Sequence, residues 1–379
     1  MAVEVSAVTG KRELKRFVTF PIRLHRDDPC YVPPLVSDDM STFSADKNPA
    51  FENAEARFFL ACREGRIVGR VAAILSHSAN RKYGTKNLRF GWFESVDDPE
   101  VPAALFAAVE AWGRELGMET LTGPHGFCDL DPEGMLIEGF GELGTLGALW
   151  TPHYCPALLE RLGFTKEIDW VEFEGKTPPG GIPERMVRLG EFVLKRNKFR
   201  IARYPTLKKL RAARQKELFD LLDECFAELY GSVPLTDRQK EYYANKYLPF
   251  VNMEFLKLVV NEDDRMIGFM IAVPSFSRAM QKAHGRLFPF GFVHLLRAMK
   301  KFDRLEFLLA GVKKEYRGKG VDLLMILEIF RAALKHGVKY AESNVELETN
   351  TKIQAEWKIV ENRQHKRRRL YRKAIAPAP

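Results

Sequence analysis

The chain has 379 residues, of which 46% are hydrophobic and 29% are charged, and its formal net charge is +9. This length fits two ordinary domains of about 150–200 residues better than one, and the composition excludes a disordered or collagen-like chain. No uncharged apolar run reaches the roughly 18 residues of a membrane-spanning helix, and the charged N-terminal segment lacks the apolar core of a signal peptide. We therefore expect a cytoplasmic protein.

The N-terminal half shows a regular order of elements. Its sequence predicts a hairpin over 58–74, a helix over 101–116, a strand over 118–122 and a short helix over 157–163. Glycines follow both helices, as is common where a helix ends.

A linker separates the two halves. The stretch from Thr177 to Pro183 contains three prolines and two glycines, and 184–197 has the pattern of a connecting helix. We therefore predict an N-terminal domain over 1–176, a linker and helix over 177–198, and a C-terminal domain over 199–379 with an insert at 275–304.

The C-terminal half repeats the order of the first. Its sequence predicts a hairpin over 256–273, a strand over 305–312, a helix over 321–335, a strand over 340–346 and a helix over 353–360. Repetition over about 199 residues indicates a duplicated domain and not a solenoid. The expected fold class is α/β, with α+β character and a mixed sheet.

The most informative motif is Tyr316-Arg-Gly-Lys-Gly-Val-Asp322, between a predicted strand and a predicted helix. A glycine loop that enters a helix N-terminus exposes backbone N–H groups, and the helix dipole favours a pyrophosphate there. Arg317 and Lys319 add positive charge, and Gly320 allows a close backbone approach. The alternative is a plain strand-to-helix turn, because short Arg/Gly matches are frequent by chance.

The order strand, Arg-x-x-Gly-x-x, helix, strand, helix resembles the acyl-CoA-binding core of the GNAT (Gcn5-related N-acetyltransferase) superfamily. The resemblance implies two tandem GNAT-like domains, with acyl-CoA (acetyl-CoA or a longer chain) in the C-terminal one and a degenerate, structural N-terminal one. The cofactor-binding residues that it implies are Leu309, Ala310, Gly311, Val312, Arg317, Gly318, Lys319, Gly320, Val321, Asp322 and Asn350.

Two positions depart from the family pattern. Asp322 stands where the last Gly or Ala of the loop belongs, and Trp357 stands where the family usually has a tyrosine general acid. A carboxylate repels a pyrophosphate, so Asp322 must point away, cap the helix or imply a shifted cofactor.

Acylation of an amine requires a base and backbone N–H groups that stabilise an oxyanion. In the family, the strand before the loop, here 309–312, supplies those N–H groups. The candidate catalytic residues are Glu346 and Glu348 for the base and ammonium binding, Asn344 and Asn350 for orientation, and Glu306 as a further carboxylate. A strand over 340–346 would place Glu342, Asn344 and Glu346 on one face. The alternative for each carboxylate is a solvated edge or a structural ion pair.

The five cysteines, at 30, 62, 128, 155 and 225, show no C-x-x-C spacing. This argues against a disulfide framework and against a zinc site, so no metal is expected.

Two segments, 277–304 and 361–373, each hold seven basic residues and one acid, so the remaining chain is slightly acidic. In the first, a helix would place Phe292, Leu295, Leu296, Met299 and Phe302 on one apolar face. Such a helix can lie on an anionic membrane surface, roof an acyl tunnel or pack in the core.

The second segment reads as a basic strand whose charge faces an anionic substrate group or the CoA phosphates. A solvated charge run and a nucleic-acid tail are the alternatives, and nucleic acid is not the favoured partner.

The insert, the tandem layout and the C-terminal segment resemble a bacterial group of large GNAT-like proteins similar to bacterial ceramide synthases. The resemblance implies an acyl-CoA-dependent N-acyltransferase that acts on a primary amine, such as an amphipathic sphingoid base, with peripheral contact at the inner membrane face. The rivals are a short-chain N-acetyltransferase of a small metabolite and a non-catalytic regulatory protein that binds CoA or nucleic acid.

Overall fold

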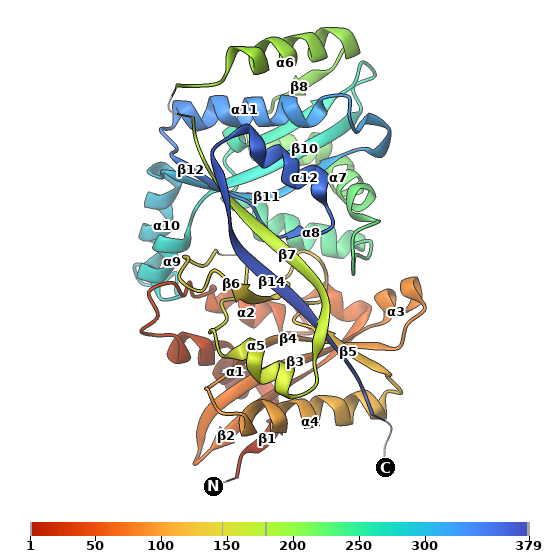
Figure 1. Ribbon diagram of the computed structural model, residues 1–379, viewed down its shortest axis with the longest axis vertical. Coiled ribbons are helices and arrows are strands. Elements are labelled where there is room, and N and C mark those ends of the chain that lie inside the picture. The colour runs from red at the N-terminus through yellow and green to blue at the C-terminus, as the bar shows by residue number, and fades with distance from the viewer. Residues whose placement is uncertain (1, 146, 179, 377–379) are drawn as a thin grey trace.

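The computed structural model describes residues 2–145, 147–178 and 180–376. Figure 1 shows an elongated molecule with the N-terminal half at the bottom and the C-terminal half at the top. One mixed sheet runs through both halves in the order β1-β2-β3-β4-β5-β14-β7-β12-β11-β10-β9-β8, with β6 paired to β14 and β13 paired to β7.

The N-terminal half contains seven strands and five helices among the described residues. The strands are β1 (Glu4–Ala7), β2 (Ala54–Arg63), β3 (Arg66–Ser76), β4 (Asn87–Ser95), β5 (Thr120–Gly123), β6 (Met135–Glu138) and β7 (Thr165–Lys176). The helices are α1 (Gly10–Leu24), α2 (Val36–Thr42), α3 (His77–Tyr83), α4 (Glu100–Glu115) and α5 (Cys155–Arg161), with a 3-10 turn at Pro49–Glu52.

The C-terminal half begins after the predicted linker, in which residue 179 lies outside the described residues. Its strands are β8 (Arg200–Ala202), β9 (Leu256–Val260), β10 (Met266–Pro274), β11 (Arg304–Val312), β12 (Tyr340–Glu342), β13 (Glu346–Leu347) and β14 (Asn362–Ala374). The helices are α6 (Glu184–Asn197), α7 (Leu207–Phe226), α8 (Asp237–Tyr247), α9 (Ser277–Ala283), α10 (Gly291–Lys300), α11 (Val321–Lys335) and α12 (Thr351–Glu356). The 3-10 turns are Leu248–Phe250, Met253–Phe255, Lys314–Tyr316 and Trp357–Ile359.

Both halves follow the same plan, which confirms the predicted mixed α/β class. In each half an antiparallel hairpin, β2–β3 or β9–β10, is followed by a third antiparallel strand, β4 or β11. A long helix, α4 or α11, then leads to a strand, β5 or β12, that pairs in parallel with this third strand. Each long helix packs its apolar side on the hairpin of its own half: α4 contributes to one buried cluster and α11 to another. No helix among the described residues is long and apolar enough to cross a membrane.

The last strands of the two halves are exchanged. β7, which ends the N-terminal half, pairs with β12 of the C-terminal half, and β14, which ends the chain, pairs with β5 of the N-terminal half. The two long strands also pair with each other along ten register positions. Figure 1 shows them crossing the middle of the molecule, and the end of β14 lies beside α4, where Lys373 pairs with Glu110. Each half therefore needs a strand from the other to complete its sheet. The domain boundaries at 176 and 198 stay a proposal.

Two predicted elements differ from the structure. The strand predicted over 340–346 is interrupted, because only 340–342 and 346–347 pair with neighbours. The helix predicted over 353–360 begins earlier, at Thr351, and ends in a 3-10 turn at 357–359.

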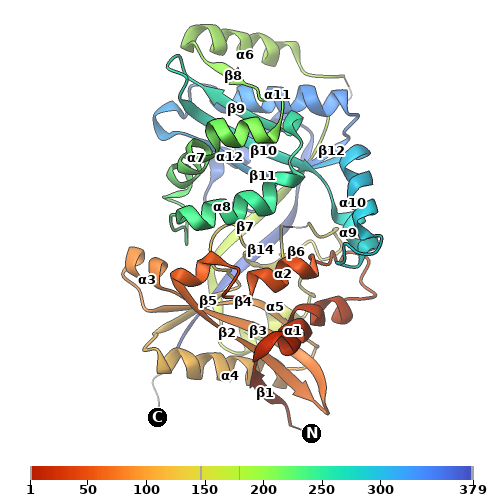
Figure 2. The same ribbon diagram turned by 180° about the vertical axis from the view of Figure 1, so that it is seen from behind.

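The insert at 275–304 of the C-terminal half contacts the N-terminal half. Figure 2 shows α9 and α10 at one side of the molecule, beside the N-terminal helices. The Gln281 side chain donates hydrogen bonds to the carbonyls of Pro29 and Tyr31, and the Val36 amide donates to the Gly285 carbonyl. A side chain at Gly285 would meet the Pro34 carbonyl at 2.4 Å, so the contact requires glycine.

Candidate active site

Two parallel strands of the C-terminal half diverge and open the candidate site. β12 pairs with β11 only at residues 304–306. From Phe307 onward, β11 keeps its β10 neighbour but has no paired strand on the other side among the described residues. At the start of this gap the side-chain amide of Asn344 donates a hydrogen bond to the Leu308 carbonyl at 3.3 Å. The divergence leaves backbone groups of β11 without sheet partners, available to a ligand.

The gap between β11 and the segment after β12 contains a cavity of about 560 Å³. The predicted residues that line it are Asn344, Glu346, Asn350, Leu309, Ala310, Gly311, Val312, Arg317, Gly318 and Asp322. The predicted residues Lys319, Gly320, Val321, Glu306 and Glu348 do not line it. Apolar walls come from α7 and the turn after it, β10 and β11, including Phe226, Leu229 and Met270.

The glycine loop enters α11 with left-handed backbone at two positions. Gly318 has a φ of 75° and Gly320, the residue before the helix, a φ of 82°, which L side chains rarely adopt. A side chain at Gly320 would also meet Val193 of α6 at 2.8 Å, so the connecting helix packs on the outside of the loop. The first turn of α11 is thereby fixed at the cavity end of the helix, where the helix dipole is positive.

The cations of this loop lie differently from each other. Arg317 lines the cavity, and its Nε donates to the Val312 carbonyl at 3.1 Å. Lys319 instead lies 4.9 Å from the ring centroid of Tyr316. Val321 is fully buried in the core beneath the loop.

Asp322 faces the cavity and accepts a hydrogen bond from the Leu323 amide at 2.9 Å. The side chain of Glu356, at the end of α12, lies beside it. Burial and the Asp322 carboxylate raise the pKa of Glu356 to about 8. A protonated Glu356 can therefore donate a hydrogen bond to Asp322 and adds no second negative charge beside it.

Gly311 allows close packing beneath the cavity floor. A side chain there would meet Phe269 at 2.7 Å and the Cys225 sulfur at 2.8 Å. The backbone of residues 309–312 therefore runs close against β10 and α7, with its free edge toward the cavity.

Glu346 has the environment of a proton acceptor. Its Oε1 accepts a hydrogen bond from the Trp357 indole at 2.8 Å, while its buried Oε2 has no hydrogen-bond partner in the described part of the chain. Burial raises the pKa of Glu346 to about 7, although the bond from Trp357 opposes this. Trp357 also stacks on Phe173 with ring centroids 6.0 Å apart, which holds the indole in place. The residue at the family's tyrosine position thus orients a carboxylate.

The other predicted carboxylates are engaged elsewhere. Glu348 forms an ion pair with Lys166 at 2.8 Å and contacts Arg367. Glu306 is buried against Ser277, and burial raises its pKa to about 7. Glu342 does not share a face with Glu346: it pairs with Arg304 at 2.6 Å, since the strand breaks after it.

The basic C-terminal strand does not present its charge to a ligand, contrary to the sequence-based expectation. All seven of its basic side chains pair with carboxylates, mostly on β7 and neighbouring segments; they are Arg363, Lys366, Arg367, Arg368, Arg369, Arg372 and Lys373. The acids of β7 lie on both faces of the strand: Asp169 pairs with Arg367 and Arg369 on one face, and Glu172 pairs with Lys366 and Arg368 on the other, which the sequence of either segment alone does not reveal.

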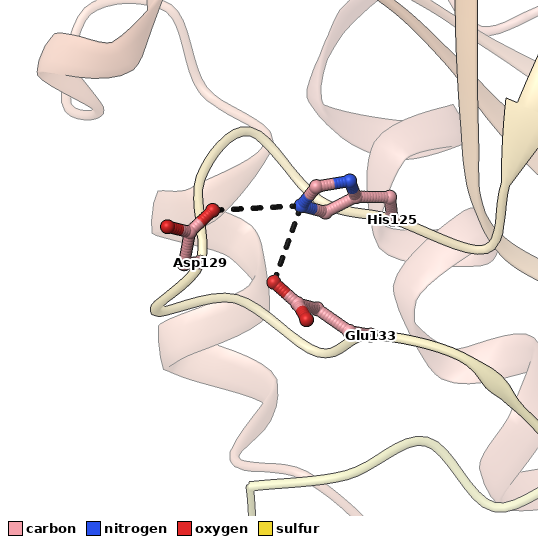
Figure 3. Close-up of side chains that lie close together, drawn as sticks. All are labelled: His125, Asp129 and Glu133. Atoms are coloured by element: carbon pink, nitrogen blue, oxygen red, sulfur yellow. Dashed lines mark ion pairs between the residues drawn. The ribbon is translucent and has the colours of Figure 1, made fainter. Parts of the chain in front are cut away.

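The N-terminal half supplies residues that sequence reasoning missed. Asp129 and Glu133 line the same cavity as β11 and the glycine loop. With His125 they form a cluster between β5 and β6, shown in Figure 3, in which His125 and Glu133 are buried and Asp129 is partly buried. The sequence feature that could have indicated this cluster is the Gly- and Pro-rich stretch 123–134. No helix or strand is predicted there, yet it contains a histidine and three acids.

Comparisons with solved structures agree with this architecture. A tandem GNAT protein from the clavulanic acid biosynthesis pathway superposes with a TM-score of 0.60 and 13% identity, covering all of both chains. A GNAT from Sphaerobacter thermophilus gives a TM-score of 0.51 at 13% identity and covers 97% of that chain. The chain therefore has the fold of tandem GNAT proteins.

Two curated proteins are similar along nearly the whole chain. Protein YghO of Escherichia coli (strain K12) is 29% identical over 98% of this chain and 95% of its own length. A bacterial ceramide synthase of Caulobacter vibrioides is 28% identical over 98% of both chains. The resemblance predicted from the sequence is thus confirmed. No model of a known protein family matches the chain.

Proposed function

We propose that this protein is an acyl-CoA-dependent N-acyltransferase. The observation that carries the proposal is one cavity that joins the N-terminus of α11, the unpaired edge of β11 and the Glu346 carboxylate. These are an anion site, a row of backbone donors and a base, the three parts that acyl transfer to an amine requires. The GNAT fold and the full-length similarity to a ceramide synthase support the acyltransferase class.

In this proposal the loop residues hold the diphosphate of the donor. Amides at the start of α11 and the Arg317 guanidinium offer hydrogen bonds to phosphate oxygens. Backbone N–H groups of 309–312 are offered to the thioester carbonyl, where negative charge develops during attack. A protonated Glu356 donates a hydrogen bond to Asp322 and adds no second negative charge near the phosphates.

Glu346 is the candidate base. It takes one proton from the acceptor ammonium, so that the neutral nitrogen attacks the thioester carbon. The C–N bond forms, the C–S bond breaks, and the CoA sulfur takes a second proton from the nitrogen. With its pKa raised to about 7, Glu346 is strong enough to accept a proton and still ionised in a large fraction near neutral pH.

We further propose an amphipathic amine as the acceptor, with peripheral binding to an anionic membrane. Four apolar side chains of the insert are solvent-exposed: Phe288 at 78%, Phe290 at 73%, Leu296 at 52% and Phe292 at 40%. The segment 277–304 that carries them has seven basic residues and one acid. Exposed aromatic residues beside basic ones favour the interface of an anionic bilayer. By contrast, Leu295 of the same helix is buried.

The test is acyl transfer by purified protein, with acyl-CoAs of graded chain length as donors. Octylamine and sphinganine serve as acceptors, and N-acyl product is measured by mass spectrometry. Product from either amine supports the proposal. Absence of product together with absence of CoA binding by calorimetry would contradict it. A preference for acetyl-CoA and octylamine over long-chain substrates would favour the short-chain alternative.

A further inference from the structure

The His125 cluster contains unsatisfied polar atoms in a buried position. His125 is 2% exposed, and its Nε2 lies 3.2 Å from Glu133 Oε1 and 3.8 Å from Asp129 Oδ1 (Figure 3). Neither Nε2 nor Asp129 Oδ1 has a hydrogen-bond partner within the described ranges. Buried polar atoms are rarely left without partners, so the cluster is built to receive a further group.

The loop that carries the cluster is fixed from both halves of the molecule. The Tyr243 hydroxyl of α8 donates to Asp131 at 3.3 Å, and the Tyr247 hydroxyl donates to the Leu130 carbonyl at 3.0 Å. A side chain at Gly231 would meet the His125 ring at 2.8 Å. Residues of the C-terminal half therefore hold an N-terminal loop against the cavity.

The charge balance of the cluster favours one additional positive charge. Arg89 is buried beside it and donates to the carbonyls of Gly126 and Gly231. Before His125 is protonated, the two carboxylates and the guanidinium sum to −1. Burial and Arg89 lower the pKa of His125, but Glu133 and Asp129 raise it overall, so the two carboxylates favour a positive charge beside them.

We infer that Asp129 and Glu133 form the subsite that binds the ammonium group of the acceptor amine. The inference rests on the proposed function and gives the N-terminal half a part in the reaction beyond structural support. Both carboxylates line the cavity that holds Glu346 and the free edge of β11. The ammonium is held by ion pairs from the N-terminal half, while Glu346 of the C-terminal half takes its proton. His125 is a positioning residue behind the two carboxylates.

A monovalent cation suits the cluster better than a metal ion. The ligand atoms of the three side chains lie within 4.8 Å of one another, a spacing that a divalent ion could also bridge. A divalent ion would leave a net charge of +1 in a buried site that already contains Arg89, whereas an ammonium neutralises it.

The experiment measures binding to the full chain without acyl-CoA. Isothermal titration calorimetry with octylammonium chloride compares wild type, Asp129→Asn, Glu133→Gln and the control Asp263→Asn, an acid on an exposed turn. Octanol serves as the neutral probe of the same length. We expect each cluster variant to bind octylammonium about tenfold more weakly, with unchanged affinity for octanol and CoA. Unchanged CoA affinity shows that the variants are folded.

Two results would overturn the inference. One is equal octylammonium affinity in wild type and in both cluster variants. The other is one equivalent of zinc or manganese in the purified protein that disappears in His125→Ala, which would make the cluster a metal site. Because acyl-CoA is absent from this titration, a wild type that fails to bind CoA would contradict the proposed function separately.

Discussion

The Nε of Arg368 on the last strand lies 2.6 Å from Oε1 of Glu172 on β7, and both side chains are 1% exposed. Burial alone would raise the pKa of Glu172, but Arg368 and Lys366 hold it below its usual range. The pair therefore stays charged in the interior and joins the strands that the two halves exchange. Its partner atoms come from opposite sides of the linker, so neither half can satisfy them alone.

We expect Arg368→Ala to lower the free energy of unfolding by about 3–5 kcal/mol, because it leaves Glu172 charged and buried without its partner. Urea denaturation followed by circular dichroism measures the loss. Arg363→Ala on the same strand is the matched control, since Arg363 is half exposed and its removal should cost about 1 kcal/mol or less. Equal losses in the two variants would contradict the assignment of the exchange as a stabilising feature.

Glu346→Gln should lower kcat by about 10²–10⁴-fold with little change in acyl-CoA affinity, because the variant removes only the proton acceptor. The control is Glu348→Gln, whose carboxylate is paired with Lys166 outside the cavity. In wild type, kcat/KM should rise with pH through about 7 and then level off, as Glu346 must be ionised to act. A Glu346→Gln variant that keeps full activity would exclude Glu346 as the base.

Arg317→Ala should weaken CoA binding about tenfold, because a charged donor to the diphosphate is lost. Lys314→Ala is the control: its ammonium pairs with Glu228 at 2.7 Å, and Lys314 does not line the cavity. Calorimetry with CoA measures both variants. If the two affinities fall equally, general surface charge and not the glycine loop would account for binding.

Glu306→Gln should make the protein more stable above neutral pH. Burial raises the pKa of Glu306 from 4.5 to about 7, so its protonated form is favoured in the folded state. The associated stability is present below pH 4.5 and is lost as the pH rises through about 7. At pH 8 we expect the variant to exceed wild type by about 3 kcal/mol, and below pH 4.5 the two should converge. Urea denaturation midpoints of wild type and variant across this pH range measure the stability difference. A difference that does not change with pH would contradict the raised pKa of Glu306.

Phe288→Ser/Phe290→Ser should reduce binding to phosphatidylglycerol vesicles roughly tenfold in a flotation assay, because two exposed aromatic anchors are removed. Leu189→Ser/Phe192→Ser on α6 is the matched control, since these side chains are also exposed, at 48% and 55%, but lie outside the insert. Binding should also weaken with salt. Equal binding by both double variants would remove the insert from the membrane proposal.

Local sequence patterns determined most elements and the glycine loop at 316–322. The helices at 101–116, 184–197 and 321–335 follow from apolar periodicity with glycine or polar ends, and the structure confirms them within about one residue. The loop at 316–322 could be predicted because its glycines and basic residues are adjacent in the sequence and directly precede a helix. The repeat of hairpin, helix and strand identified the duplicated plan for the same reason.

Only the tertiary structure decided how the halves share strands and which acids meet the cavity. Strand pairing between β7 and β14 joins residues about 200 positions apart, and no local pattern encodes it. The same pairing joins the basic side chains of β14 to carboxylates in a row of ion pairs, and the pairing of β13 with β7 places Glu348 beside Lys166. Asp129 and Glu133 reach the β11 cavity because α8 holds their loop in place, a contact that forms only when both halves are folded.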